Sequence, residues 1–72
     1  MHDSNPQRYE IRIRGHLGES TLRAFPEMDS ETKAGDTVLT GQLRDQAALF
    51  GVIGQIERLG LELLELSGVP RT

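Results

Sequence analysis

The sequence predicts an α+β domain, a ferredoxin-like βαββαβ sandwich in which two helices cover one face of a four-stranded antiparallel sheet. Residues 8–14 alternate strictly between polar and apolar side chains, as a half-buried strand does, and residues 46–59 carry apolar side chains at helical spacing. Shorter patterns complete the order strand, helix, strand, strand, helix, strand. Right-handed crossovers in two such strand–helix–strand units place all four strands in one sheet and both helices on the same side.

The first strand has one apolar and one polar face. Its apolar residues Tyr9, Ile11 and Ile13 alternate with charged ones, which are Arg8, Glu10, Arg12 and Arg14. Because only one face needs burial, this alternation fits a sheet that is covered on one side and open on the other. Residues 1–7 carry no periodic apolar residue, and we expect a flexible lead-in there.

A short helix and a hairpin follow the first strand. The turn at residues 15–18 leads into about two turns of helix over residues 19–25, which the following proline ends. Residues 27–43 then form the hairpin, since the Gly35-Asp36 pair permits the positive φ angles of a tight turn. The second arm of the hairpin has the stronger strand pattern.

The longest helix is predicted between Asp45 and Gly60. An aspartate at the N-cap accepts hydrogen bonds from the free amides of the first turn, and glycine readily adopts the left-handed conformation that stops a helix. A last strand over residues 61–66 completes the domain, which we place at residues 8–67, with a frayed tail at residues 68–72. The helix carries an apolar stripe for the core, made of Ala48, Leu49, Val52, Ile53, Ile56 and Leu59.

Composition excludes several classes of protein. The 72 residues carry a net charge of −3, which disfavours nucleic acid as a partner, and one tyrosine and two phenylalanines do not make the stacking platform of an RNA-recognition sheet. No cysteine is present for a disulfide, and no apolar run approaches the roughly 20 residues that cross a bilayer. The start of the chain lacks a secretory pattern. We therefore expect a single cytoplasmic domain that binds neither nucleic acid nor membranes.

Few residues could carry chemistry. His2 falls in the lead-in and His16 in a turn, and no pair of nucleophile and base can be assembled, so we expect neither an enzyme nor a metal or cofactor. Glu27, Asp29 and Glu31 recur at every second residue of the first hairpin arm. Such a row either keeps an edge strand soluble or offers oxygen ligands to a divalent cation, and both interpretations stay open.

Side chains that do not belong to the predicted core predict a protein–protein interface. Phe50 lies outside the apolar stripe of the long helix, among small residues that let another backbone approach closely. It either contacts a second copy or a partner, or covers the short helix of the same molecule. The arginines of the first strand project from its polar face, where acidic groups of another molecule could meet them. The candidate interface residues are Arg12, Arg14, Ala47, Phe50, Gly51 and Gly54.

The turn before the short helix supports a second hypothesis. Small-molecule regulatory domains of the same topology bind amino acids there, through loop amides near a helix N-terminus. By that analogy, the candidate ligand-binding residues are Gly15, His16 and Gly18.

The second half of the chain resembles a family of short, uncharacterised bacterial proteins. The shared stretch runs from Thr-Gly at residues 40–41, through Asp-Gln-Ala-Ala-Leu at residues 45–49, to Leu-Gly-Leu at residues 59–61. The similarity covers residues 37–66 well and the earlier part of the chain as a pattern only. Similar chains often carry histidine where this one has Phe50, so no histidine-based role transfers. The resemblance implies no established activity, substrate or catalytic residue.

The size of the core favours self-association. A chain this short buries only about 60% of the surface that its unfolded state exposes, and no disulfide is present to stabilise it. We therefore predict a non-enzymatic protein-interaction module that forms a homodimer or binds another protein. A small-ligand-binding regulatory domain of the amino-acid-binding type is the alternative.

Overall fold

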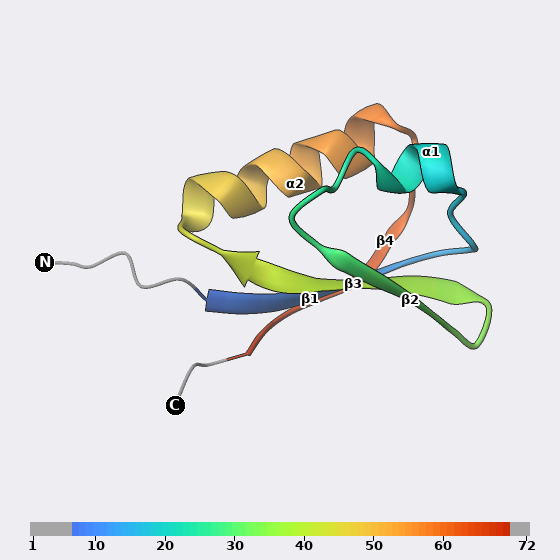
Figure 1. The fold of residues 1–72 in the computed structure, drawn as a ribbon, viewed down its shortest axis with the longest axis horizontal. Coiled ribbons are helices and arrows are strands. Elements are labelled where there is room, and N and C mark those ends of the chain that lie inside the picture. Colours follow the sequence, from blue (N-terminus) through green and yellow to red (C-terminus); the bar gives the residue numbers. More distant parts are fainter. Residues whose placement is uncertain (1–6, 70–72) are drawn as a thin grey trace, which may run out of the picture.

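The computed structural model describes residues 7–69, which form an α+β domain built on one four-stranded sheet (Figure 1). The chain runs through β1 (Gln7–Ile13), α1 (Glu19–Leu22), β2 (Asp29–Lys33), β3 (Asp36–Leu43), α2 (Gln46–Arg58) and β4 (Leu63–Val69). The strands lie in the order β2-β3-β1-β4, and every neighbouring pair is antiparallel. Both helices lie above the sheet in the view of Figure 1. The predicted α+β class and the four-stranded antiparallel sheet are confirmed.

The core lies between the two central strands, β1 and β3, and the helix layer above them. Ile11 of β1 pairs with Leu39 of β3, and neither side chain is exposed. Leu49 and Ile56, seven residues apart on α2, pack against them together with Phe25 from the segment after α1. The partly buried side chains packed around this cluster are Tyr9, Leu22, Ala24, Met28, Ala48, Val52, Ile53 and Leu61.

Both predicted ends of the long helix are confirmed. Asp45 is the N-cap of α2, and its Oδ1 accepts a hydrogen bond from the amide of Ala48 at 2.9 Å. Gly60 follows the C-cap with a φ of 73°, the left-handed conformation expected of a helix stop. Leu59, however, is the C-cap itself and is 43% exposed, so its predicted place in the core stripe is wrong.

The first helix is shorter than predicted. The sequence predicts helix over residues 19–25, whereas α1 is a single turn that ends at Leu22. Beyond it, the amide of Phe25 bonds to the carbonyl of Leu22, and the amide of Met28 bonds to the carbonyl of Phe25. These tight turns direct the Phe25 side chain into the core, where it is 3% exposed, and burial of this ring takes precedence over another helical turn.

The hairpin turn falls one residue earlier than predicted. Lys33 pairs with Asp36, so the two turn residues are Ala34 and Gly35, with φ angles of 54° and 84°. Asp36 is the first residue of β3 rather than part of the turn. Two positive φ angles are the requirement of a two-residue hairpin turn, and here alanine adopts one of them.

The last strand starts later and ends later than predicted. β4 spans Leu63–Val69 because Ser67, Gly68 and Val69 pair with the first residues of β1. The register shifts between Arg12 and Ile13, which produces an irregularity in β4 at Leu64. Gln7 likewise belongs to β1. The remainder of the predicted lead-in, with His2, and the end of the predicted tail lie outside the described residues.

Candidate interaction surface

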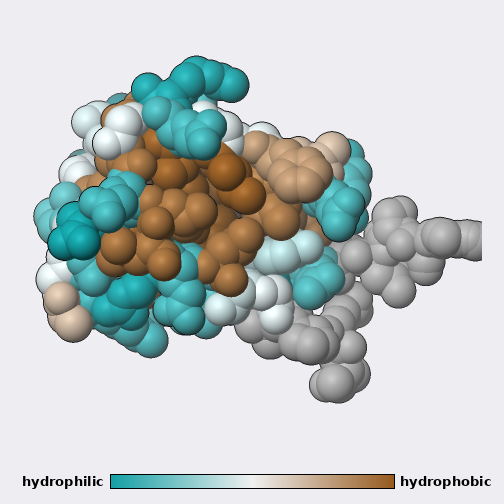
Figure 2. Space-filling model, turned by 180° about the vertical axis from the view of Figure 1, so that it is seen from behind, coloured by the Kyte–Doolittle hydropathy of each residue, from teal (hydrophilic) through white to brown (hydrophobic). Residues whose placement is uncertain are grey.

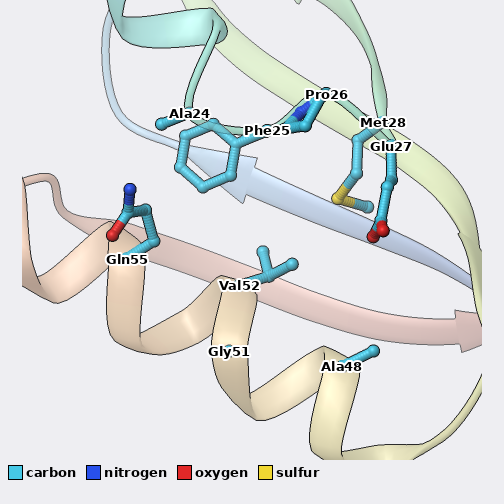
Figure 3. Close-up of a pocket in the computed structure, with 9 residues that line it drawn as sticks. All are labelled: Ala24, Phe25, Pro26, Glu27, Met28, Ala48, Gly51, Val52 and Gln55. Carbon is cyan, nitrogen blue, oxygen red and sulfur yellow. The ribbon is translucent and has the colours of Figure 1, made fainter.

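Phe50 lies on the outer side of α2, with 62% of its surface accessible to solvent. One flank of α2 faces the segment after α1 across a groove, and it consists of Ala48, Gly51, Val52 and Gln55 (Figure 3). At 100° per residue, Phe50 and Ile53 fall on the opposite flank, away from α1. The structure therefore contradicts the alternative in which Phe50 covers the short helix of the same molecule.

Three leucines of β4 are exposed, and the strand pairing places two of them on the helix-facing side of the sheet. Leu66 pairs with Ile11 and Leu63 pairs with Ile13, so each leucine points to the same side as its buried partner. Ile11 and Ile13 are 0% exposed, whereas Leu63, Leu64 and Leu66 are 37%, 38% and 40% exposed. The helix layer therefore buries the side chains of β1 and β3 on this side of the sheet but leaves those of β4, the outermost strand, partly exposed.

The exposed flank of α2 and the uncovered side of β4 together form one apolar surface. We call Phe50, Ile53, Leu63, Leu64 and Leu66 the α2–β4 surface. Seen from behind the view of Figure 1, hydrophobic side chains gather in one broad patch with a hydrophilic border (Figure 2). A contiguous apolar patch of this kind is typical of a surface that contacts another protein, a membrane or a ligand.

The opposite edge of the sheet has a different character. All five side chains of β2 are exposed, and Asp29, Glu31 and Lys33 share one face by their pairing with β3. Charges on an edge strand prevent pairing with another chain. Within residues 7–69, no group of three or more His, Asp or Glu side chains converges to hold a metal ion. The geometry thus favours the charged-edge interpretation of the acidic row.

The two candidate interface arginines bind acidic groups of their own molecule. The Nε of Arg12 lies 3.3 Å from Oδ2 of Asp36, and its Nη2 donates to the carbonyl of Lys33 at 3.2 Å. The Nε of Arg14 lies 2.9 Å from Oε1 of Glu62, in a pair whose side chains are 65% and 60% exposed. Each guanidinium thus already has an acidic partner in its own molecule, so the two arginines are less suited to bind acidic groups of a second molecule.

Asp36 connects three segments of the chain. Its Oδ1 accepts a hydrogen bond from the amide of Gly15 at 3.0 Å, while its Oδ2 faces the Arg12 guanidinium. The amide of Gly15 is the main cause that lowers the pKa of Asp36, and Arg12 adds to it against a partial loss of hydration. The carboxylate form of Asp36 therefore holds the turn after β1 against the hairpin.

The turn proposed for ligand binding is fastened to β3 by its own amides. The amide of Gly15 binds Asp36, and the amide of Leu17 donates to Oγ1 of Thr37 at 3.2 Å. The same hydroxyl donates to the carbonyl of Gly15 at 2.7 Å, and Thr37 is 3% exposed. His16 is exposed, and its Nδ1 lies 3.4 Å from Oγ1 of Thr32. The amides of Gly15 and Leu17 are thus already used to hold the turn in place.

The groove beside α2 has a volume of about 310 Å³ and a largely apolar lining. Its walls are α2 and the Ala24–Met28 segment, with Phe25 and Val52 projecting toward the space between them (Figure 3). The polar side chains Glu27 and Gln55 belong to opposite walls. A small ligand is usually oriented by several convergent polar groups, and this lining offers none that converge. Gly51, a candidate interface residue, lies on the rim, with nothing within 4 Å of an added Cβ.

Sequence reasoning missed the leucines of β4. Phe50 is the apolar side chain that the sequence pattern places outside the core, whereas the leucines of the predicted last strand at residues 61–66 are not set apart from it. Two signals could have identified them. Leu63 and Leu64 are consecutive, which breaks the polar–apolar alternation, and the last strand of the predicted topology is an edge strand.

Ala47 is exposed and Gly54 is half-buried, so the other small candidates lie on the outer face of α2 near Phe50.

Comparisons with known proteins identify a family for this chain but no function. Of the helices within the described part of the chain, none is long and apolar enough to cross a membrane. A search of curated proteins finds no match, and a search of solved structures finds none. A family model described as a domain of unknown function (DUF8691) matches residues 8–67, a span that contains both helices and the whole α2–β4 surface. Because this match covers most of its length, the chain belongs to the DUF8691 family.

Proposed function

We propose that the protein is a non-enzymatic interaction module that self-associates through the α2–β4 surface. One observation carries the proposal. Phe50 is 62% exposed beside a strand whose three leucines are each more than a third exposed. Fully burying an exposed large apolar side chain contributes roughly 1.5–3 kcal/mol, so covering the exposed parts of these four side chains favours association against its entropic cost.

A second copy of the chain is the occupant that the surface fits best. The surface combines a helix flank with an uncovered edge strand, and a two-fold axis brings the same patch of two copies together. All five residues of the surface are apolar, whereas the exposed Glu57 lies on the same flank of α2, so a second copy has to leave Glu57 at the rim of the contact. The charged β2 edge on the other side of the sheet disfavours association there.

We also propose that the architecture is a ferredoxin-like sandwich. The chain order β1-α1-β2-β3-α2-β4, with β1 and β3 in the centre of the sheet, supports this description. Because α1 is a single turn, the crossover from β1 to β2 contains less helix than is typical of a ferredoxin-like sandwich. A short α1 also leaves α2 as the principal cover of the sheet, which is consistent with an uncovered β4.

Size-exclusion chromatography with light scattering tests the proposed function. We expect the wild-type chain to run at twice its 8.0 kDa mass at micromolar concentration. Phe50→Glu should weaken the dimer at least about 10-fold, since it places a carboxylate in an apolar contact. Thr32→Glu, on the exposed β2 edge, is the matched control and should leave the mass unchanged. A wild-type chain that stays monomeric at millimolar concentration contradicts the proposal.

Circular dichroism separates loss of the interface from loss of the fold. Because Phe50 is exposed and lies outside the core cluster, Phe50→Glu should keep the wild-type far-ultraviolet spectrum. An unfolded Phe50→Glu variant would mean that Phe50 supports the monomer, contrary to the proposal.

A further inference from the structure

We infer that two copies of the chain join by antiparallel pairing of β4 with β4, about a two-fold axis at Leu66, to form one eight-stranded sheet. This inference rests on the proposed self-association and specifies the geometry of its interface. Two four-stranded sheets, each ending in β4, become continuous in this arrangement.

Within residues 7–69, no strand pairs with the outer edge of β4, so backbone groups along that edge have no ladder partner there. Arg14 directly follows β1 and donates its amide to the carbonyl of Glu62 at 3.0 Å, so its backbone N–H is directed toward the segment that leads into β4. In an antiparallel ladder the direction alternates with each residue, and therefore Arg12 and Glu10 also bond to β4, through Glu65 and Ser67. Leu66 and Gly68 alternate with these partners. Their amides and carbonyls consequently point away from β1, toward the open edge.

Charge and length select the register. Leu66 is the midpoint of β4, so an axis at this residue pairs residues 65–67 of the two copies regularly and brings residues 63–64, which include the irregularity at Leu64, beside residues 68–69 of the other copy. It also places Glu65 of each copy opposite Ser67 of the other. An axis at Glu65 would instead place two carboxylates directly opposite each other, which is unfavourable in a sheet. An axis at Ser67 would leave the first residues of β4 unpaired.

The same axis buries the apolar side chains. A two-fold axis perpendicular to the sheet keeps the helices of both copies on one side. Leu66 of one copy then meets Leu66 of the other on that side, since Leu66 shares a face with buried Ile11. Leu63 and Leu64 flank this contact, and the Phe50 flanks of the two α2 helices face each other above it. Backbone pairing and apolar burial thus occur in one step.

The other edge limits the assembly to two copies. Pairing of β4 with β2 of another molecule would be head-to-tail and would leave free edges for further growth. All side chains of β2 are exposed, and Asp29, Glu31 and Lys33 place charges along it. Such charges oppose strand addition, so the edge that pairs is β4 and the product is a closed dimer.

Single cysteines test this geometry, because the natural chain has none. Opposed residues of a hydrogen-bonded antiparallel pair have Cα atoms about 5.5 Å apart, within the range that a disulfide spans. Leu66→Cys should therefore oxidise to a covalent dimer. Ser67→Cys is the matched control in the same strand, because residue 67 faces residue 65 of the second copy and its two Cα atoms lie beyond about 7 Å. Thr32→Cys reports on the β2 edge.

We expect Leu66→Cys to cross-link at least about 10-fold faster than either control under mild oxidation, with each reduced variant first shown by light scattering to keep the wild-type mass. Faster cross-linking of Thr32→Cys or Ser67→Cys than of Leu66→Cys overturns the β4 pairing. If the wild-type chain is still a dimer in that case, the proposed self-association stands and only its geometry is wrong. A wild-type monomer overturns both. If Leu66→Cys fails to fold, Glu65→Cys mixed with Ser67→Cys replaces it, since residues 65 and 67 are exposed and face each other in the proposed register, and failure of that mixture to cross-link a wild-type-like dimer contradicts the inference.

Discussion

Leu66 lies directly opposite Ile11 in the β1–β4 ladder, yet Ile11 is completely buried and Leu66 is 40% exposed. The two side chains are on the same side of the same sheet. The difference arises because β1 is a central strand beneath the helix layer, whereas β4 is the outermost strand. An edge strand with an apolar, uncovered face is unusual for a monomer, since exposed apolar edges promote association. The contrast between these two residues makes β4 the candidate site of association.

Thr37→Val should destabilise the fold by about 1–3 kcal/mol, because it removes a buried hydroxyl and keeps its shape. That hydroxyl donates to the carbonyl of Gly15 and accepts from the amide of Leu17, and both would lose their partner. Urea denaturation measures the change. Thr32→Val, at an exposed site on β2, is the control and should stay within about 0.5 kcal/mol of wild type. An unchanged stability in Thr37→Val would show that the turn does not depend on Thr37.

Asp36→Asn should lower stability in a manner that depends on pH. The folded pKa of Asp36 is below its unfolded value, so the stability it contributes is complete above the unfolded pKa, about 4, and is lost as the pH falls through the folded pKa. The difference between wild type and Asp36→Asn should therefore be constant above about pH 5 and shrink toward pH 2. Denaturation at a series of pH values measures it, and a difference that is the same at every pH contradicts the role of the carboxylate.

Arg12→Gln separates the two causes of the Asp36 shift. The amide of Gly15 is the largest single cause that lowers the pKa of Asp36, and Arg12 lowers it through both a hydrogen bond and its charge. Arg12→Gln should consequently retain the part of the acid-dependent loss of stability that is due to the Gly15 amide. Equal effects of the two substitutions would assign the shift to Arg12 instead.

Ala34→Asn should stabilise the hairpin by about 0.5–1 kcal/mol. Ala34 has a φ of 54°, a conformation that costs most residues roughly 1–2 kcal/mol but that asparagine tolerates, and Asn-Gly is the preferred pair for this turn. Thermal denaturation should show a higher melting temperature. Ala34→Val is the opposing control, because a β-branched side chain is strained there and should lower the melting temperature. A lower melting temperature in Ala34→Asn contradicts the turn assignment.

Gly41→Ala should destabilise the fold by about 1–3 kcal/mol, because the new methyl group has no room. An added Cβ would lie 2.8 Å from the carbonyl oxygen of Glu27 and 3.2 Å from Cα of Met28, both of which are backbone atoms. Gly51→Ala is the matched control on α2, where nothing lies within 4 Å, and it should gain up to about 1 kcal/mol in helix propensity. Chemical denaturation should give opposite signs, and equal signs would refute this account of Gly41.

The elements that sequence reasoning predicted well are those with a local physical cause. The alternation around Ile11 depends on one strand, and the ends of α2 depend on the carboxylate of Asp45 and the left-handed Gly60. The errors have tertiary causes. α1 stops at Leu22 because Phe25 is drawn into the core, and β4 extends to Val69 because β1 offers partners.

The candidate site was predictable in part. Phe50 stands out from the helical pattern alone, and its exposure agrees with that expectation. Leu63, Leu64 and Leu66 do not stand out, because the sequence of a strand shows which side is apolar and not whether a helix covers it. The contacts of Arg12 with Asp36 and of Arg14 with Glu62 likewise depend on strand register, which brings together residues far apart in the chain.

Amide hydrogen exchange of the wild-type chain, followed residue by residue in nuclear magnetic resonance spectra, tests the central claim most directly. The Ser67 amide bonds to β1 in any folded state and serves as the internal reference. The Leu66 and Gly68 amides point away from β1 and gain a partner only when β4 pairs with a second copy. We predict that, at the same concentration, exchange at Leu66 and Gly68 is at least about 10-fold slower in the wild-type chain than in the Phe50→Glu variant, while Ser67 stays protected in both. Equally fast exchange at Leu66 and Gly68 in the two chains would contradict the account.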